Sequence, residues 1–431
     1  MKEHLETRRK TNNITQDFVV LLEFAVLRAT FDLKRFGSVS GQQLGQMYRT
    51  YRGDNRLYLR LAELRLDEDL LRVLTKSLRC LLSDYIENDR IGNGLVNFLG
   101  GITEPSVLDY TRDLVRVAAI LGPERLGQLL YGWAKGEPIR YGVSAVLSGL
   151  SVDEPLVMGR GIRLSKLPES SDALKDELPP LVDMQFGIMN MAGATKVTLD
   201  CQGSPIFYKA GTRTFQDFQT TWKYGHLEQS SLDALCDALS LANNSCVRLV
   251  IAWSDFGELD VLGAGSGFSI YRASDRTSGG PRMSCAHIAK AKDLLVKRLD
   301  DHLSDKKLDL AISRWMSSKR GGRVADQFID LRIALEALYL PNGEGELSFR
   351  LAIRGAWHLG RNYEERLECQ KTLRDAYNTA SKAIHATTKP YTPEDEKLLR
   401  AAQDLCRKGI LKRLDECGTP DWNGLILGKD I

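Results

Sequence analysis

Three polar side chains near the C-terminus have a spacing that places them on one face of a helix. Asn378, Lys382 and His385 are separated by four and three residues, and helix positions at these spacings are surface neighbours. A histidine exchanges protons near neutral pH, and a lysine carries a positive charge that can hold an anion. Such a face could combine proton transfer with anion binding. Taken alone, His385 is more often a helix-end residue that favours the negative end of the helix dipole.

A second group of charged residues lies upstream, around a tryptophan. It consists of Lys306, Lys307, Arg314, Trp315, Lys319, Arg320 and Arg323. Cations interleaved with an aromatic ring are typical of segments that contact RNA, and Lys319 and Arg320 are the candidate contacts here. Asp301, Asp305 and Asp309 partly neutralise the segment, so an exposed helix face is the alternative interpretation.

The sequence gives no pattern for a metal or a cofactor. None of the eight cysteines forms a Cys-x-x-Cys pair, and the histidines show no ligand spacing. The glycines of 263–267 precede a strand-like segment without a lysine, which favours a hairpin loop over a phosphate-binding loop. We therefore expect no metal site and no cofactor.

Composition and charge are those of an ordinary soluble protein. The formal net charge is +3, from 59 basic and 56 acidic residues, so no global signal indicates a nucleic-acid or membrane-surface binder. The longest stretch without charge runs from Ile91 to Thr103, shorter than the roughly 20 apolar residues of a spanning helix. Cysteines such as Cys80 and Cys236 lie in apolar helical stretches, as free thiols do in a reducing compartment. We expect a cytoplasmic protein without membrane insertion.

Four amphipathic helices in the last third must position the candidate residues. Apolar residues three and four positions apart, with caps and breakers at the ends, predict helices at about 326–340, 347–359, 364–389 and from 392 onward. The last of them opens with Thr392 and Pro393, which suit a helix cap and a first helical position. Short links between such helices predict a helical bundle, which we place at residues 305–417.

The remainder of the chain predicts a mainly α protein with an α+β middle region. A chain of 431 residues is expected to form two or three domains. Residues 1–160 show mostly helical apolar spacing and form the predicted N-terminal helical region. A turn-rich connection follows, and residues 181–300 then alternate short β-branched runs with Gly, Asn and Ser, which is typical of an α+β region.

Three segments of the predicted bundle carry a family resemblance. They read DQFIDLRIALEALYL at 326–340, GELSFRLAIRGAWHLG at 345–360 and EERLECQKTLRDAYNTASKAIHA at 364–386. In order and spacing they resemble the signature segments of Apea-like HEPN domains, which are helical domains of prokaryotic RNA-targeting and defence proteins. The residues that carry the resemblance together are Asp330, Glu336, Arg350, Ala356, Trp357, Tyr377 and His385.

The third segment departs from the family pattern at one position. In these HEPN domains it contains a tyrosine, then arginine, serine and lysine in a row, and then a histidine; the arginine and the histidine form the ribonuclease motif. Tyr377, Ser381, Lys382 and His385 match this pattern, whereas Ala380 stands where the arginine is expected. The resemblance therefore implies a damaged active site.

The chemistry of metal-independent RNA cleavage shows what this change removes. Cleavage needs a base for the ribose 2′-hydroxyl, an acid for the leaving oxygen and a cation for the charge on phosphorus. The resemblance assigns proton transfer to His385, but Ala380 cannot supply the cation, and such a loss costs on the order of 10²- to 10³-fold in rate. Lys382 is the local substitute, although a lysine lacks the planar fork of arginine.

The resemblance implies a HEPN-domain protein of prokaryotic anti-phage (antiviral) defence, and the basic residues Arg374, Lys319 and Arg320 are its candidate RNA contacts. Two functions remain open. The first, which Ala380 favours, is a non-catalytic, RNA-associated interaction or effector protein. The alternative is an active metal-independent endoribonuclease of the abortive-infection type that uses His385, with Lys382 and Asn378 beside it. HEPN sites generally form where two bundles meet, so a homodimer or a partner protein bound through the bundle is expected in either case.

Overall fold

The structure is a computed structural model that describes part of the 431-residue chain. The described residues are 72–74, 76, 97–98, 101–102, 118, 123–134, 139–178, 191–203, 230–255, 268–270, 280–299, 305–340, 345–384, 391–416 and 420–427. The chain divides into two compact units. The first unit comprises residues 1–146, 154–229 and 250–277, and the second comprises 147–153, 230–249 and 278–431. The prediction of a mainly α protein with an α+β middle region is confirmed.

The first unit is built around a six-stranded sheet. Its strands are β3 (Ile139–Ser148), β4 (Leu156–Gly159), β5 (Ile162–Lys166), β6 (Thr195–Gly203), β7 (Arg248–Asp255) and β8 (Phe268–Ile270), in the spatial order β4-β5-β6-β3-β7-β8. The pairings β4–β5, β5–β6 and β7–β8 are antiparallel. Arg160 and Gly161 connect β4 to β5 with φ of 49° and 76°, so this two-residue hairpin turn has the positive φ values of a type I′ turn.

The sheet begins earlier in the chain than the sequence predicts. β3 and β4 both lie within residues 1–160, the predicted helical region. β3 occupies a central position in the sheet, and its side chains from Val143 to Ser148 are all buried. A strand that is buried on both faces lacks the alternation of apolar and polar residues by which strands are recognised.

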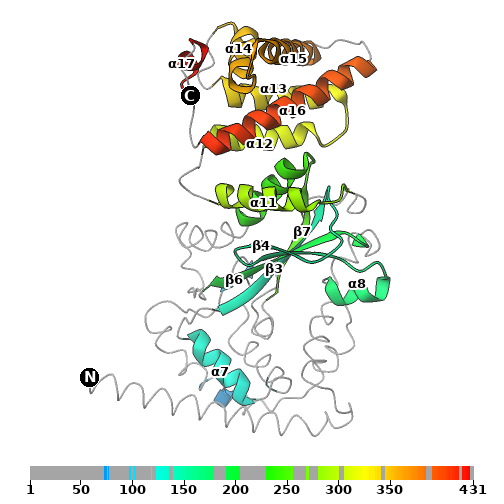
Figure 1. The fold of residues 1–431 in the computed structure, drawn as a ribbon. Helices are drawn as coiled ribbons and strands as arrows, with labels where there is room; N and C mark the ends of the chain where they lie inside the picture. Colours follow the sequence, from blue (N-terminus) through cyan, green and yellow to red (C-terminus); the bar gives the residue numbers. More distant parts are fainter. Residues whose placement is uncertain are drawn as a thin grey trace, which may run out of the picture. The chain divides into compact units, whose positions relative to one another are not determined.

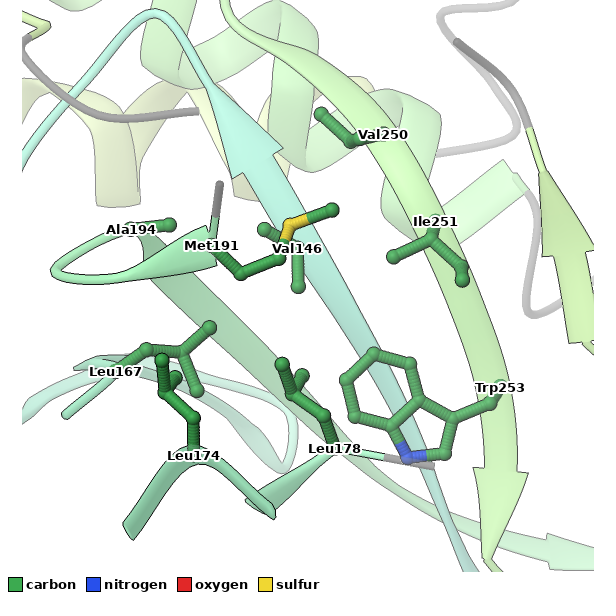
Figure 2. Packing of buried hydrophobic residues seen from close by; sticks show 9 residues of the cluster. All are labelled: Val146, Leu167, Leu174, Leu178, Met191, Ala194, Val250, Ile251 and Trp253. Carbon is green, nitrogen blue, oxygen red and sulfur yellow. The ribbon is translucent and has the colours of Figure 1, made fainter. Parts of the chain in front are cut away.

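A short helix packs apolar side chains against this sheet. α8 (Ser171–Glu177) is capped by Ser170, whose hydroxyl accepts a hydrogen bond from the amide of Ala173. Figure 2 shows the resulting cluster, which consists of Val146, Leu167, Leu174, Leu178, Met191, Ala194, Val250, Ile251 and Trp253. The ammonium group of Lys196 lies 5.7 Å from the centre of the Trp253 ring. The described remainder of this unit includes the two-stranded pair β1 (Asn97–Phe98) and β2 (Gly101–Ile102) and the helix α7 (Pro123–Ala134).

The second unit is mainly helical in its described part (Figure 1). It contains a helix over residues 230–243 and the helices α11 (Cys285–Arg298), α12 (Lys306–Ser318), α13 (Val324–Tyr339), α14 (Leu347–Leu359), α15 (Tyr363–Ile384), α16 (Pro393–Glu416) and α17 (Trp422–Ile426). The four helices that the apolar spacing predicts are α13 to α16. None of the described helices of the chain combines the length and the apolar character that crossing a membrane requires.

The core of the bundle is dense and partly polar. α13 buries Phe328, Leu331 and Leu335 along one side. The indole of Trp315 donates to the carbonyl oxygen of Gln403 at 2.9 Å, and the Gln403 amide donates back to the Ser318 carbonyl oxygen at 2.8 Å. These hydrogen bonds join α12 to α16 with the buried polar groups satisfied, so burial carries little penalty at this contact.

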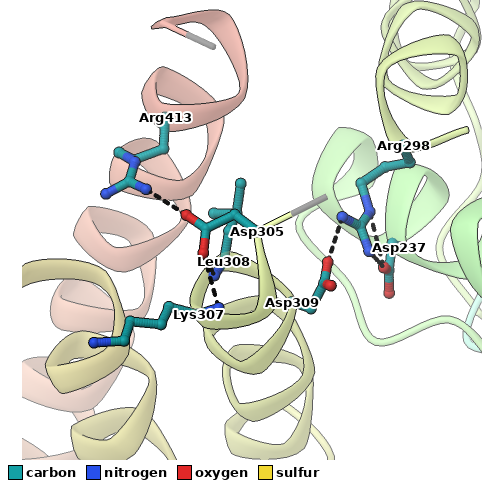
Figure 3. Close-up of polar contacts among 7 residues, drawn as sticks. All are labelled: Asp237, Arg298, Asp305, Lys307, Leu308, Asp309 and Arg413. Carbon is teal, nitrogen blue, oxygen red and sulfur yellow. Dashed lines mark hydrogen bonds and ion pairs between the residues drawn. The ribbon is translucent and has the colours of Figure 1, made fainter. Parts of the chain in front are cut away.

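Ion pairs connect the helices at the other end of α12 (Figure 3). Arg298 donates to Asp237 Oδ2 at 2.9 Å and to Asp309 Oδ1 at 2.7 Å, which ties the 230–243 helix to α11 and α12. Asp305 caps α12 and accepts from Arg413 Nη2 at 2.6 Å. Burial raises the pKa of Asp237 to about 6, and the Arg298 charge opposes part of this rise.

Candidate functional site

The predicted polar face lies on the outer side of α15. Arg374, Asn378 and Lys382 are all exposed and stand four residues apart. Four helical residues correspond to a rise of about 6 Å, so the three side chains form a straight row along the helix. The Asn378 Oδ1 atom accepts a hydrogen bond from Ser348 Oγ of α14 at 3.3 Å. Arg374 Nε lies 3.9 Å from Asp375 Oδ1, in a surface position where such a contact is weak.

His385 lies outside the described residues. α15 is described as far as Ile384, so the structure places Asn378 and Lys382 but gives no position for the imidazole. The assignment of His385 to proton transfer therefore stays a prediction from the family resemblance.

Ala380 lies on the inner side of α15. Its exposed fraction is 1%, and its neighbours on the same side, Leu373 and Ala376, are also buried. The position at which the family has its arginine is therefore a core position in this bundle. An arginine side chain here would begin within the packed interior, whereas Lys382 two residues later begins in solvent.

Tyr377, which matches the family motif, is held by a residue that sequence reasoning missed. Arg332 of α13 donates to the Tyr377 hydroxyl at 2.9 Å, and its guanidinium carbon lies 4.3 Å from the ring centre. Arg332 also donates from Nε to Glu336 Oε1 at 2.8 Å. Burial raises the pKa of Tyr377, so its hydroxyl keeps its proton at neutral pH. The spacing of Arg332 and Glu336 by four residues was the available signal for their ion pair.

The predicted RNA-contacting residues lie on two separate segments of the bundle. Arg374 is on α15, whereas Lys319 and Arg320 follow α12. Lys319 donates to Asn244 Oδ1 at 3.0 Å and lies 5.8 Å from the Trp315 ring centre. Burial, and then the nearby charge of Arg407, lower the pKa of Lys319. Lys319 thus serves as a contact to the end of the 230–243 helix.

Arg320 remains an exposed cation at the same end of the bundle as Lys382. α13 and α15 run in opposite directions. Arg332 of α13 contacts Tyr377 of α15. Tyr339 lies later on α13 and Leu373 lies earlier on α15, and both lie against Gly355 of α14. The start of α13 therefore lies beside the end of α15. The exposed Arg320, a few residues before α13, belongs to this end.

The described residues contain no group of three or more His, Cys, Asp or Glu side chains that could hold a metal ion. No protein-family model, no curated protein and no solved structure matches the chain. The resemblance to Apea-like HEPN domains therefore rests on the quoted segments themselves.

Proposed function

We propose that the C-terminal bundle is a HEPN-like domain that binds RNA without cleaving it, in an effector protein of prokaryotic anti-phage defence. The observation that carries the proposal is the contrast on α15 between the exposed row Arg374, Asn378 and Lys382 and the buried Ala380. Two cations with an amide between them suit an RNA backbone, because cations and amides supply most protein contacts to phosphate and sugar. The role in defence rests on the family resemblance.

The absence of cleavage follows from the missing cation. A transition state with charge on phosphorus needs a fixed positive group, and Ala380 is both uncharged and buried. Lys382 offers a flexible point charge on the exposed side, which suits the holding of a phosphate better than the fixed geometry of catalysis. The alternative is an active endoribonuclease that uses His385. The exposed Lys382 would be the cation that supports it.

A homodimer is part of the proposal, and the outer side of the α14–α15 pair supports it. The exposed fractions of Phe349, Tyr363 and Leu367 are 54%, 72% and 52%. Exposed glutamates occupy the first half of this side of α15, whereas Arg374 and Lys382 occupy its second half. A second copy would bury Tyr363 and Leu367 of the first half, which leaves the second half accessible to RNA.

RNA binding is tested by fluorescence anisotropy with a labelled single-stranded RNA over a range of salt concentrations. The double substitution Arg374→Gln with Lys382→Gln is expected to weaken binding and to reduce the slope of log K against log salt by about 1.4, the value for two phosphate contacts on a single strand. The matched control removes the same charge at two exposed lysines of α11, with Lys290→Gln and Lys292→Gln. Equal affinities of the two double variants, or no binding by the native protein, would refute the proposed face.

Cleavage is tested on the same RNA in the presence of a chelator. The native protein and His385→Ala are compared at equal concentration, with products separated on a denaturing gel. We expect intact RNA in both samples. Cleavage by the native protein that disappears in His385→Ala would replace the non-catalytic proposal with the endoribonuclease.

A further inference from the structure

A histidine is fully buried beneath the short C-terminal helix. The His358 side chain of α14 has an exposed fraction of 0%. Its Nε2 atom lies 3.1 Å from Glu416 Oε2, and its Nδ1 atom lies 3.4 Å from the Tyr339 hydroxyl. A carboxylate only accepts, so Nε2 carries the proton, and Nδ1 then accepts from the hydroxyl. For a neutral imidazole, these partners select the tautomer with the hydrogen on Nε2.

Trp422 attaches α17 to this buried ring. The centre of the indole ring lies 5.6 Å from the ring centres of both His358 and Tyr339, edge to face in each case. The guanidinium carbon of Arg354 lies 5.7 Å from the same indole ring. The Trp422 N–H is buried and has no hydrogen-bond acceptor in the part of the chain that the structure describes. Departure of α17 would give this N–H a hydrogen bond to water.

We propose that α17 is a pH-sensitive strap, which covers His358 while its imidazole is neutral and detaches when the imidazole takes up a proton. The strap itself is small. Within α17 only Trp422 and Leu425 are buried, so few apolar contacts are lost when it leaves.

Burial disfavours a positive charge on the imidazole in the closed state, and the charges around it have both signs. The titratable and charged groups that face it from the packed elements are Tyr339 of α13, Arg354 of α14, and Lys412, Arg413 and Glu416 of α16, with Asp305 of α12 paired to Arg413 and Asp421 at the start of α17. In the neutral state the Tyr339 hydroxyl donates to Nδ1. Protonation would put a hydrogen on Nδ1 that points at this hydroxyl, so the present hydrogen bond would be lost. Burial lowers the pKa of His358, and the Glu416 contact only partly opposes this.

The direction of the pH effect follows from linkage. With α17 detached, the imidazole is hydrated and its pKa returns to about 6.5. At pH values between the lower pKa of the closed state and about 6.5, the open state therefore binds more protons than the closed state. Opening becomes more favourable, by at most tenfold per pH unit, as the pH falls through this range, and it is independent of pH above about 7.

Hydrogen–deuterium exchange of the full chain between pH 8 and pH 5, corrected for the intrinsic exchange rate, measures this opening. Amides of residues 421–427 are expected to be protected at pH 8 and to lose protection, by at most tenfold per pH unit, as the pH falls below roughly 6.5. A peptide from within α15 is the internal reference and should keep its protection. Protection of α17 that is absent at pH 8, or unchanged down to pH 5, would overturn the proposal.

Three substitutions distinguish titration of His358 from general damage. His358→Gln should abolish the pH dependence of exchange in α17. Glu416→Gln removes the nearest anion, lowers the closed-state pKa of His358 and should extend the pH-dependent range to lower pH. Lys412→Gln removes a nearby cation, raises that pKa and should shorten the range, and neither variant should move the onset near pH 6.5. An unchanged profile in His358→Gln, or shifts of both other variants in the same direction, would contradict the strap. Because Glu416 and Lys412 are partly exposed, this pair decides the question even where His358→Gln does not fold.

Discussion

The inner and outer sides of α15 use the same stretch of sequence for two different purposes. On the inner side, Tyr377 and Ala380 are buried, and Tyr377 is bonded to Arg332. On the outer side, Asn378 and Lys382 are exposed, and Ser348 of α14 donates a hydrogen bond to Asn378 at 3.3 Å. Residues that look like one motif in the sequence thus divide into packing residues and surface residues. The position of the missing arginine, Ala380, lies on the inner side, so the substitution changes the core of the bundle and not its outer surface.

The largest expected effect breaks this contrast by placing a charge on the inner side. Ala380→Arg restores the family residue, but it puts a large cation at a position with 1% exposure. We expect the free energy of unfolding of the bundle to fall by about 3–5 kcal/mol, the usual cost of an uncompensated buried charge. Calorimetric unfolding of the full chain measures it.

Lys382→Arg is the matched control for that experiment, because it adds a guanidinium two residues away on the outer side. Its stability should stay within about 0.5 kcal/mol of the native protein. A stable Ala380→Arg variant that gains RNA cleavage would show that an arginine at this position reaches the outer side. The separation of α15 into an inner packing side and an outer binding side would then be wrong.

Sequence reasoning located α15 and its outer face but could not separate the two roles. Helical spacing was enough to group Asn378 with Lys382, because the period of a helix is fixed. The burial of Ala380 depends on neighbouring helices far away in the sequence, and alanine occurs readily on either side. Arg332 was missed for a similar reason, since its bond to Tyr377 joins residues 45 positions apart. The early start of the sheet was missed because β3 is buried on both faces and shows no alternation.

The second prediction concerns the apolar part of the outer side. If a second copy covers Leu367, Leu367→Glu should weaken the dimer by about 2–4 kcal/mol, roughly 30-fold or more, since both copies lose a buried leucine. Light scattering over a dilution series measures the dissociation constant. Val296 of α11, with an exposed fraction of 57%, gives the control Val296→Glu, which should leave the mass unchanged. Identical behaviour of the two variants would remove this side of the bundle as the dimer contact.

A smaller effect is expected from the hydrogen bond that holds the inner side. Tyr377→Phe keeps the ring under Arg332 and removes only the hydroxyl, which accepts from Nη2 at 2.9 Å. The loss should cost about 1 kcal/mol of unfolding free energy, the usual net contribution of one hydrogen bond. RNA affinity should not change, because the hydroxyl faces α13. A loss of RNA affinity without a loss of stability would place Tyr377 at the binding face instead.

The smallest effect should come from Asn378, and it separates the two sides most sharply. The Asn378 side chain is exposed and has one weak contact, 3.3 Å to Ser348 Oγ, so Asn378→Ala should change stability by less than about 0.5 kcal/mol. Its amide can donate to a phosphate or sugar oxygen, and the loss of one such bond should weaken RNA binding about 2- to 10-fold without changing the salt slope. Asn423→Ala, at an exposed position on α17, is the control and should bind RNA normally. Asn378 and Tyr377 are adjacent in the chain. If Asn378→Ala lowers only the RNA affinity and Tyr377→Phe lowers only the stability, the two sides of α15 separate RNA binding from packing between neighbouring residues.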